Sequence, residues 1–169
     1  MKIKLKSILL LSAIAFTFTA CDDWGEYEPT VLPGSELAGE WYVRYTVDGA
    51  DIYGLGYHTF LTSTTAAADG KELFLNDQAN FWDFQVKAPM NVDSKTFGLA
   101  NGTDSLTNLV DGYDIKVRVT KGQVFPDGGR SKTGVQVDSI YFEVEFADDP
   151  GTIYEISGHG RTGFGDDDY

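Results

Sequence analysis

The sequence predicts an all-β domain that closes into a single eight-stranded antiparallel up-and-down barrel. Three observations support this prediction. Apolar and polar residues alternate with a period of two, Asp-Gly and Asn-Gly pairs separate the alternating runs, and 19 glycines occur among the 169 residues. Such alternation is typical of half-buried antiparallel strands, and no run after the N-terminal segment keeps the 3.6-residue apolar period of a helix.

The first element is an N-terminal segment with the order of a secretory signal. Three lysines stand near the start, an apolar run follows as far as Phe18, and small residues precede Cys21. The apolar run has about a dozen residues, fewer than the roughly 20 that a membrane-spanning helix needs. Residues 1–20 are therefore predicted to be a lipoprotein signal peptide.

Cys21 follows this signal and is the only cysteine in the chain, so a disulfide framework is excluded. Its thiol stands where a lipoprotein carries its diacylglycerol, and each buried methylene of such an anchor contributes ~0.8 kcal/mol. We expect lipidation at Cys21, membrane attachment through the lipid, and a place in the cell envelope as an outer-membrane lipoprotein, with surface exposure left open. Phe18 stands where Leu is usual in such signals, which leaves ordinary secretion as the alternative.

The next element is an acidic linker, and the whole chain is acidic as well. Residues 21–36 are rich in carboxylates and prolines and show no period, so they are predicted to be a lipidated N-terminus and linker. The full chain has 13 basic and 26 acidic residues, a formal charge of −13, which becomes −16 without the three lysines of the signal. A nucleic-acid partner is not expected, since this charge repels phosphate.

The folded domain is predicted to span residues 37–164. Its first strand rests on Trp41, Val43 and Tyr45, which alternate with polar residues, and the clearest strand is 140–146, where Ile, Phe, Val and Phe alternate with Tyr and two Glu. Eight strands are predicted, near 39–47, 56–64, 71–76, 80–87, 95–99, 113–124, 135–147 and 152–161. Residues 165–169 are predicted to be a frayed acidic tail.

Short turns between these strands favour an up-and-down barrel, because closure removes exposed sheet edges. A two-sheet β-sandwich is the alternative. An eight-stranded barrel is just wide enough either to be filled by side chains or to hold one small ligand. The number of strands therefore raises the question of what fills the interior.

Aromatic residues are predicted to face that interior, in a chain with 3 Trp, 9 Tyr and 11 Phe. Packed against one another, these rings form an ordinary core. Around an interior that is open at one end, they line an apolar pocket for a lipid or another small apolar molecule. The candidate ligand-binding residues are Trp41, Tyr45, Trp82, Phe84 and Phe142.

The segment Gly39-Glu40-Trp41 resembles the Gly-x-Trp opening of lipocalin-like barrels. In those barrels an arginine from the last strand packs across the face of the tryptophan, a contact worth ~0.5–2 kcal/mol. Arg161 stands at the end of the last predicted strand. The resemblance therefore implies a structural pair of Trp41 and Arg161.

Longer segments carry a wider resemblance, namely 37–43, 80–87, 138–146, and 154–158 with 161–164. Together they resemble a family of small bacterial envelope lipoproteins described as "lipid-binding putative hydrolase". The resemblance covers most of the domain and implies a lipocalin-like barrel with a lipid ligand. We find no catalytic motif of that family to carry over to this chain.

The residues themselves give little sign of catalysis or metal binding. A serine hydrolase needs a nucleophile, a base and an orienting acid, yet no Gly-x-Ser-x-Gly elbow occurs and only His58 and His159 could be the base. Ser157 and His159 share a strand face, which is a common chance arrangement. Two distant histidines also offer no zinc spacing, and the acidic runs lack the pattern of a calcium loop. We expect no catalytic residues, no metal and no cofactor.

Three functions therefore stand in order. The first is non-catalytic binding of a lipid or small apolar ligand in the barrel. The second is the hydrolase activity in the family's description. The third is an accessory role at the cell surface, where tyrosines on outer faces or loops bind glycan or protein; these are Tyr42, Tyr53, Tyr57, Tyr141 and Tyr154.

Overall fold

The computed structural model describes residues 29–169. The predicted signal peptide, Cys21 and the first part of the linker lie outside the described residues. The described barrel belongs to one compact unit, Val31–Tyr169. Within this range no helix combines the length and the apolar character that crossing a membrane requires.

The unit is built from nine strands and two short 3-10 turns. The strands are β1 (Gly39–Thr46), β2 (His58–Thr64), β3 (Glu72–Asn76), β4 (Gln85–Asn91), β5 (Thr96–Phe97), β6 (Leu106–Thr107), β7 (Lys116–Arg130), β8 (Gln136–Phe146) and β9 (Tyr154–Gly160). The 3-10 turns are η2 (Ser35–Leu37), before β1, and η3 (Gly165–Asp167), after β9.

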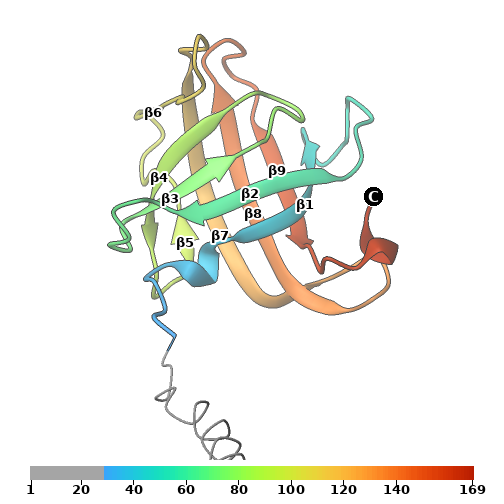
Figure 1. Cartoon of the computed structure of the whole chain (residues 1–169). Coiled ribbons are helices and arrows are strands. Elements are labelled where there is room, and N and C mark those ends of the chain that lie inside the picture. Colours follow the sequence, from blue (N-terminus) through green and yellow to red (C-terminus); the bar gives the residue numbers. More distant parts are fainter. Residues whose placement is uncertain (1–28) are drawn as a thin grey trace, which may run out of the picture. The chain divides into compact units, whose positions relative to one another are not determined.

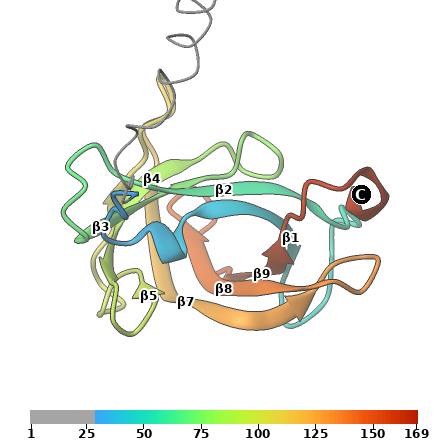
Figure 2. The same ribbon diagram turned by 60° about the horizontal axis from the view of Figure 1, so that its bottom comes forward.

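All neighbouring strands pair antiparallel, and eight of them form a closed ring. Around the ring the order is β1-β2-β3-β4-β5-β7-β8-β9, and β9 returns to β1. Strand β6 is an addition that pairs with the start of β7. Figures 1 and 2 show the ring from the side and from below. The predicted up-and-down barrel is confirmed, and the sandwich alternative is wrong because the sheet closes on itself.

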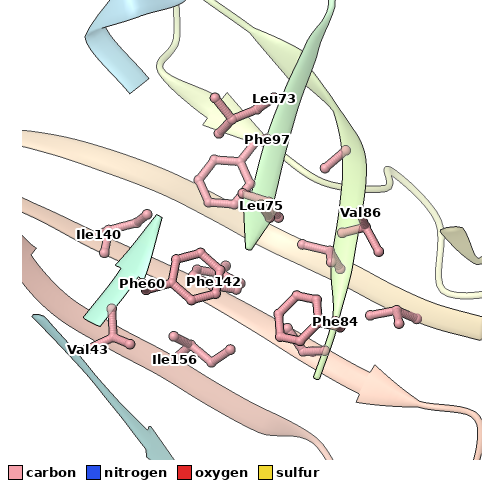
Figure 3. Close-up of a cluster of buried hydrophobic side chains, with 14 of the residues drawn as sticks. Val43, Phe60, Leu73, Leu75, Phe84, Val86, Phe97, Ile140, Phe142 and Ile156 are labelled. Atoms are coloured by element: carbon pink, nitrogen blue, oxygen red, sulfur yellow. The ribbon is translucent and has the colours of Figure 1, made fainter. Parts of the chain in front are cut away.

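The interior of the ring is a continuous apolar core. Alternate residues of each long strand are buried, as Trp41, Val43 and Tyr45 are in β1. Figure 3 shows how Phe60 from β2, Phe142 from β8 and Phe84, just before β4, come together in the middle of this core. Every buried member of the core lies between residues 37 and 156, so the unit has a core entirely of its own and is expected to fold without the segment before it.

The fourth strand differs from its prediction. Residues 80–84 are a loop, and β4 instead begins at Gln85 and continues through Pro89 to Asn91. The alternation of Trp82, Phe84 and Val86 suggested a strand, but Gln78 and Ala79 adopt left-handed backbone conformations that turn the chain. The buried side chains of this segment still point inward, so the predicted face is right and the predicted boundaries are wrong.

The C-terminal residues are not frayed as predicted. Asp167 is 1% exposed, where its carboxylate accepts hydrogen bonds from the backbone N–H of Thr133 and the hydroxyl of Thr162, both at 2.7 Å. Tyr169 packs against the rings of Tyr42 and Tyr57, with centroid distances of 5.0 and 4.4 Å. The acidic end is therefore docked on the outer wall of the barrel.

Arg161 lies over a different ring from the one expected. Its guanidinium carbon is 5.8 Å from the ring centroid of Tyr42, and its head group pairs with Glu40 and Asp168. Strand register explains the difference. Trp41 pairs with Gly160 and points into the core, so Arg161, one residue further along, shares the outer face with Tyr42.

Candidate functional site

Four of the five predicted ligand-binding residues lie in the packed core. Trp41, Tyr45, Phe84 and Phe142 are between 0 and 3% exposed. The ring of Phe60 lies between two of them, 5.2 Å from Phe142 and 5.9 Å from Phe84. These side chains fill the barrel by contacting one another. Trp82 is the fifth, and it lines an apolar hollow that opens on the surface, while Trp41 also borders a separate shallow hollow beside Glu40 and Arg161.

That hollow lies at the end of the barrel where the β1–β2 and β3–β4 loops meet. It has a volume of about 410 Å³ and is lined by Tyr53, Leu55, Asn80, Phe81 and Trp82. We call these five residues the aromatic rim. Tyr53 and Leu55 are 53% and 41% exposed, so the rim presents large apolar groups to solvent. An exposed apolar concavity of this kind is the usual form of a small-molecule site.

Aromatic contacts seat the rim on the core beneath it. Trp82 stacks on Phe146 with a centroid distance of 4.6 Å and an interplanar angle of 8°. Phe81 contacts Tyr45 and Tyr53 at 4.3 and 5.3 Å. The rim rings are therefore held from below, and their upper surfaces form the hollow.

Hydrogen bonds fix the same rings from the side. The indole N–H of Trp82 donates to the hydroxyl of Tyr113 at 2.8 Å, and Tyr113 donates to Asp148 at 2.7 Å. The hydroxyls of Tyr53 and Tyr154 lie 3.3 Å apart, close enough to share a hydrogen bond. Such chains hold amphipathic rings in one orientation while leaving their carbon faces available.

A buried carboxylate organises the loop that carries Phe81 and Trp82. Asp77 is fully buried and accepts hydrogen bonds from the backbone N–H groups of Phe81 and Trp82, at 2.8 and 3.1 Å. The hydroxyl of Tyr45 donates to its other oxygen. Burial raises the pKa of Asp77 to about 6, against the lowering effect of these hydrogen bonds. One side chain therefore sets the geometry of the rim.

This raised pKa predicts a pH dependence of stability. Because the native pKa is raised, the stabilising contribution of Asp77 is complete below its unfolded value near about pH 4 and is lost as pH rises through about 6. We compare the free energy of unfolding of the wild type with that of Asp77→Asn at each pH. The difference is expected to fall by about 2 to 3 kcal/mol from about pH 4 to about pH 7. Urea denaturation of both proteins across that range measures the difference. A difference that is constant or grows with pH would contradict the raised pKa.

The two histidines each lie against tyrosine rings in the described part of the chain. His58 stacks on Tyr45 at 5.4 Å, and burial lowers its pKa. The two ring nitrogens of His159 lie 3.1 Å from the carbonyl oxygen of Gly160 and the hydroxyl of Tyr169. Neither imidazole forms an ion pair or hydrogen bond with a carboxylate in this range, so neither has the orienting acid that a triad requires.

The described residues also contain no group of three or more His, Cys, Asp or Glu side chains that could hold a metal ion. Sequence reasoning missed Leu55, Asn80 and Phe81 as rim residues and placed Tyr53 only among outer-face or loop tyrosines. A signal was present in the segment Ile52-Tyr53-Gly54-Leu55, where large apolar residues occur within a glycine-containing loop.

Comparison with known proteins gives one family match and a distant structural likeness. A family model described as "Lipid-binding putative hydrolase" matches residues 26–165. None of the curated proteins matches the chain. A crystal structure from Bacteroides ovatus, described as structural genomics of unknown function, is similar at 17% identity with a TM-score of 0.43. The likeness covers 78% of this chain and 43% of that chain, so this chain spans less than half the length of that protein.

Proposed function

The chain belongs to the family described as "lipid-binding putative hydrolase", and from this premise we propose that it binds a lipid acyl chain, or another small apolar molecule, at the aromatic rim. The family description and the closed barrel both fit a lipid-binding role. The observation that carries the proposal is the hollow of about 410 Å³ whose lining includes the exposed Tyr53 and Leu55.

The physical gain from occupying the hollow comes from covering apolar surface. Each methylene that an acyl chain buries contributes ~0.8 kcal/mol, so four to six methylenes contribute roughly 3–5 kcal/mol before the loss of motional freedom. Ile52, which is 55% exposed and adjacent in sequence to Tyr53, offers further apolar area. The volume also falls in the range of small-molecule sites, about 300–1,000 Å³.

The ligand head group must suit an acidic end of the barrel. Asp148 and Asp149 bond to the tyrosines that support the rim. Their charges, in a chain with twice as many acidic as basic residues, disfavour an anionic head group. The proposal therefore favours an uncharged lipid, such as a monoacylglycerol.

The proposal also includes a non-catalytic role and a lipid anchor. The first is supported by the positions of His58 and His159, each without a carboxylate partner in the part of the chain that the structure describes. The second is supported by the order of residues before Cys21, whose lipid would attach the protein to the outer membrane of the cell envelope. Mass spectrometry of the protein purified from its membrane tests both the cleavage and the acylation.

Ligand binding is tested by placing a charge in the hollow. We expect Leu55→Asp to weaken binding of 1-palmitoylglycerol to residues 31–169 by about tenfold or more, because the carboxylate loses solvation beside the acyl chain. Val135→Asp is the matched control, since Val135 is 45% exposed in the β7–β8 turn. Native mass spectrometry measures the adduct, and the tryptophan emission, which comes from Trp82 in the rim and Trp41 in the core, is compared with and without the lipid.

Two outcomes would contradict the proposal. A wild-type protein that carries no adduct has no accessible lipid site. An adduct of equal abundance in both aspartate variants places the lipid away from the aromatic rim. Far-UV circular dichroism of each variant confirms that the barrel is retained.

A further inference from the structure

A second hollow lies on the outer wall of the barrel and shares no lining residue with the aromatic rim. It has a volume of about 370 Å³, and every lining residue except Gly49 carries a charged or hydroxyl-bearing side chain. It extends over β1, β9 and β8, where Arg44, Ser157 and Tyr141 contribute to it. Its composition is therefore the opposite of that of the rim.

Strand register explains why a hollow forms at this place. Arg44 pairs with Ser157, and Ser157 pairs with Tyr141, so the three side chains form a row on the outer face. Ser157 is the small member between two long ones. Tyr57 closes one side, with its ring centroid 5.5 Å from the guanidinium carbon of Arg44. The gap above Ser157 is thus a direct result of the residues on three neighbouring strands.

The hollow contains a donor that nothing in the described part of the chain satisfies. The Nε of Arg44 is buried and has no hydrogen-bond partner there. Its head group lies over the ring of Tyr57 and forms a long ion pair with Asp51, at 3.9 Å. Buried N–H groups are almost always bonded, so a water molecule or a bound ligand is the expected partner of this one. Acceptors lie nearby, because the carboxylate of Glu155 lines the same hollow.

We propose that this hollow binds an uncharged saccharide. Arg44 offers donors, Glu155 offers acceptor oxygens, and Ser157 offers a hydroxyl that can do either. Each hydroxyl of a sugar both donates and accepts, so a sugar can use all three groups at once. The rings of Tyr57 and Tyr141 supply apolar surface at the edges of the hollow.

The charges around the hollow select against ionic ligands. Glu143, in the next row of β8, is paired with Lys121 at 2.9 Å, which leaves Arg44 facing Glu155 and Asp51. An anion would meet this carboxylate excess in an acidic chain, and a cation would meet the guanidinium. A neutral molecule with many hydroxyls avoids both penalties.

The test uses residues 31–169, the unit with its own core, labelled with ¹⁵N. Maltotriose, cellotriose and triacetylchitotriose are added separately at millimolar concentration, and inorganic phosphate and glucuronate serve as anionic probes. We expect at least one neutral trisaccharide to give saturable shifts at the backbone amides of Ser157, Tyr141 and Tyr57. Ser157→Trp fills the hollow and is expected to weaken this binding by about tenfold or more.

Ser63→Trp is the matched control, because Ser63 lies on the outer face of β2 and outside the hollow. Arg44→Gln removes the unpaired donor and provides a second variant if the tryptophan prevents folding. The proposal is overturned by the absence of saturable shifts with all three saccharides. It is also overturned if saccharide binding is unchanged in both Ser157→Trp and Arg44→Gln, or if only the anionic probes bind.

Discussion

Replacing Asp77 with Ala is expected to lower the free energy of unfolding by about 3–5 kcal/mol, because one buried donor and two part-buried donors lose their acceptor at once. These donors are the hydroxyl of Tyr45 and the backbone N–H groups of Phe81 and Trp82. Each unsatisfied buried donor costs about 1–3 kcal/mol. Removing the carboxylate also removes the cost of burying its charge. The expected loss is therefore smaller than the sum of the costs of the three donors.

A double-mutant cycle separates the tyrosine from the backbone contribution. Tyr45→Phe removes one donor and leaves the two backbone bonds to Asp77 in place, so we expect a smaller loss of about 1–2 kcal/mol. In the Asp77→Ala background the same change should be close to neutral. Urea denaturation measures all four proteins. A loss below about 1 kcal/mol for Asp77→Ala would mean that water replaces the carboxylate.

The second large effect is expected from Phe142→Ala, at about 3–5 kcal/mol of unfolding free energy. Phe142 is fully buried between Phe60 and Phe97, with centroid distances of 5.2 and 5.5 Å, and its removal leaves a cavity in the middle of the core. Phe142→Leu fills most of that space and should cost less. Equilibrium denaturation compares the two variants with the wild type.

The same variant distinguishes a core residue from a ligand-binding one. If Phe142 only packs, the folded Phe142→Ala protein should bind 1-palmitoylglycerol within about twofold of the wild type, since distant sites act independently. Native mass spectrometry under stabilising conditions measures the adduct. Loss of the adduct with little loss of stability would place the ligand inside the barrel, as the sequence first suggested.

The fold could be predicted because alternation reports directly which face of a strand is buried. In β8 the buried residues Ile140, Phe142, Val144 and Phe146 follow the period of two without a break. The boundaries of β4 could not be predicted in the same way. There the turn depends on Asp77, a carboxylate whose burial against backbone donors has no signature in composition or period.

The candidate site was harder to predict because alternation says nothing about position along the barrel axis. Phe84 and Trp82 have the same predicted face, yet the first lies in the core and the second reaches the surface hollow. The contact of Arg161 with Tyr42 depends on the register of β1 and β9, which no local pattern reveals. The docked end at Asp167 depends on hydrogen bonds to residues far away in sequence, so its acidic composition was misleading.

The pairing of β1 with β9 also determines when the barrel can be completed during synthesis. The first strand has only β2 as a partner until the last strand has been made, because Trp41 must wait for Gly160, more than a hundred positions later. Contacts this far apart in sequence make folding slow. Slow closure would leave the barrel unfolded for longer after synthesis, as passage of the chain through an export channel would require under the proposed secretion.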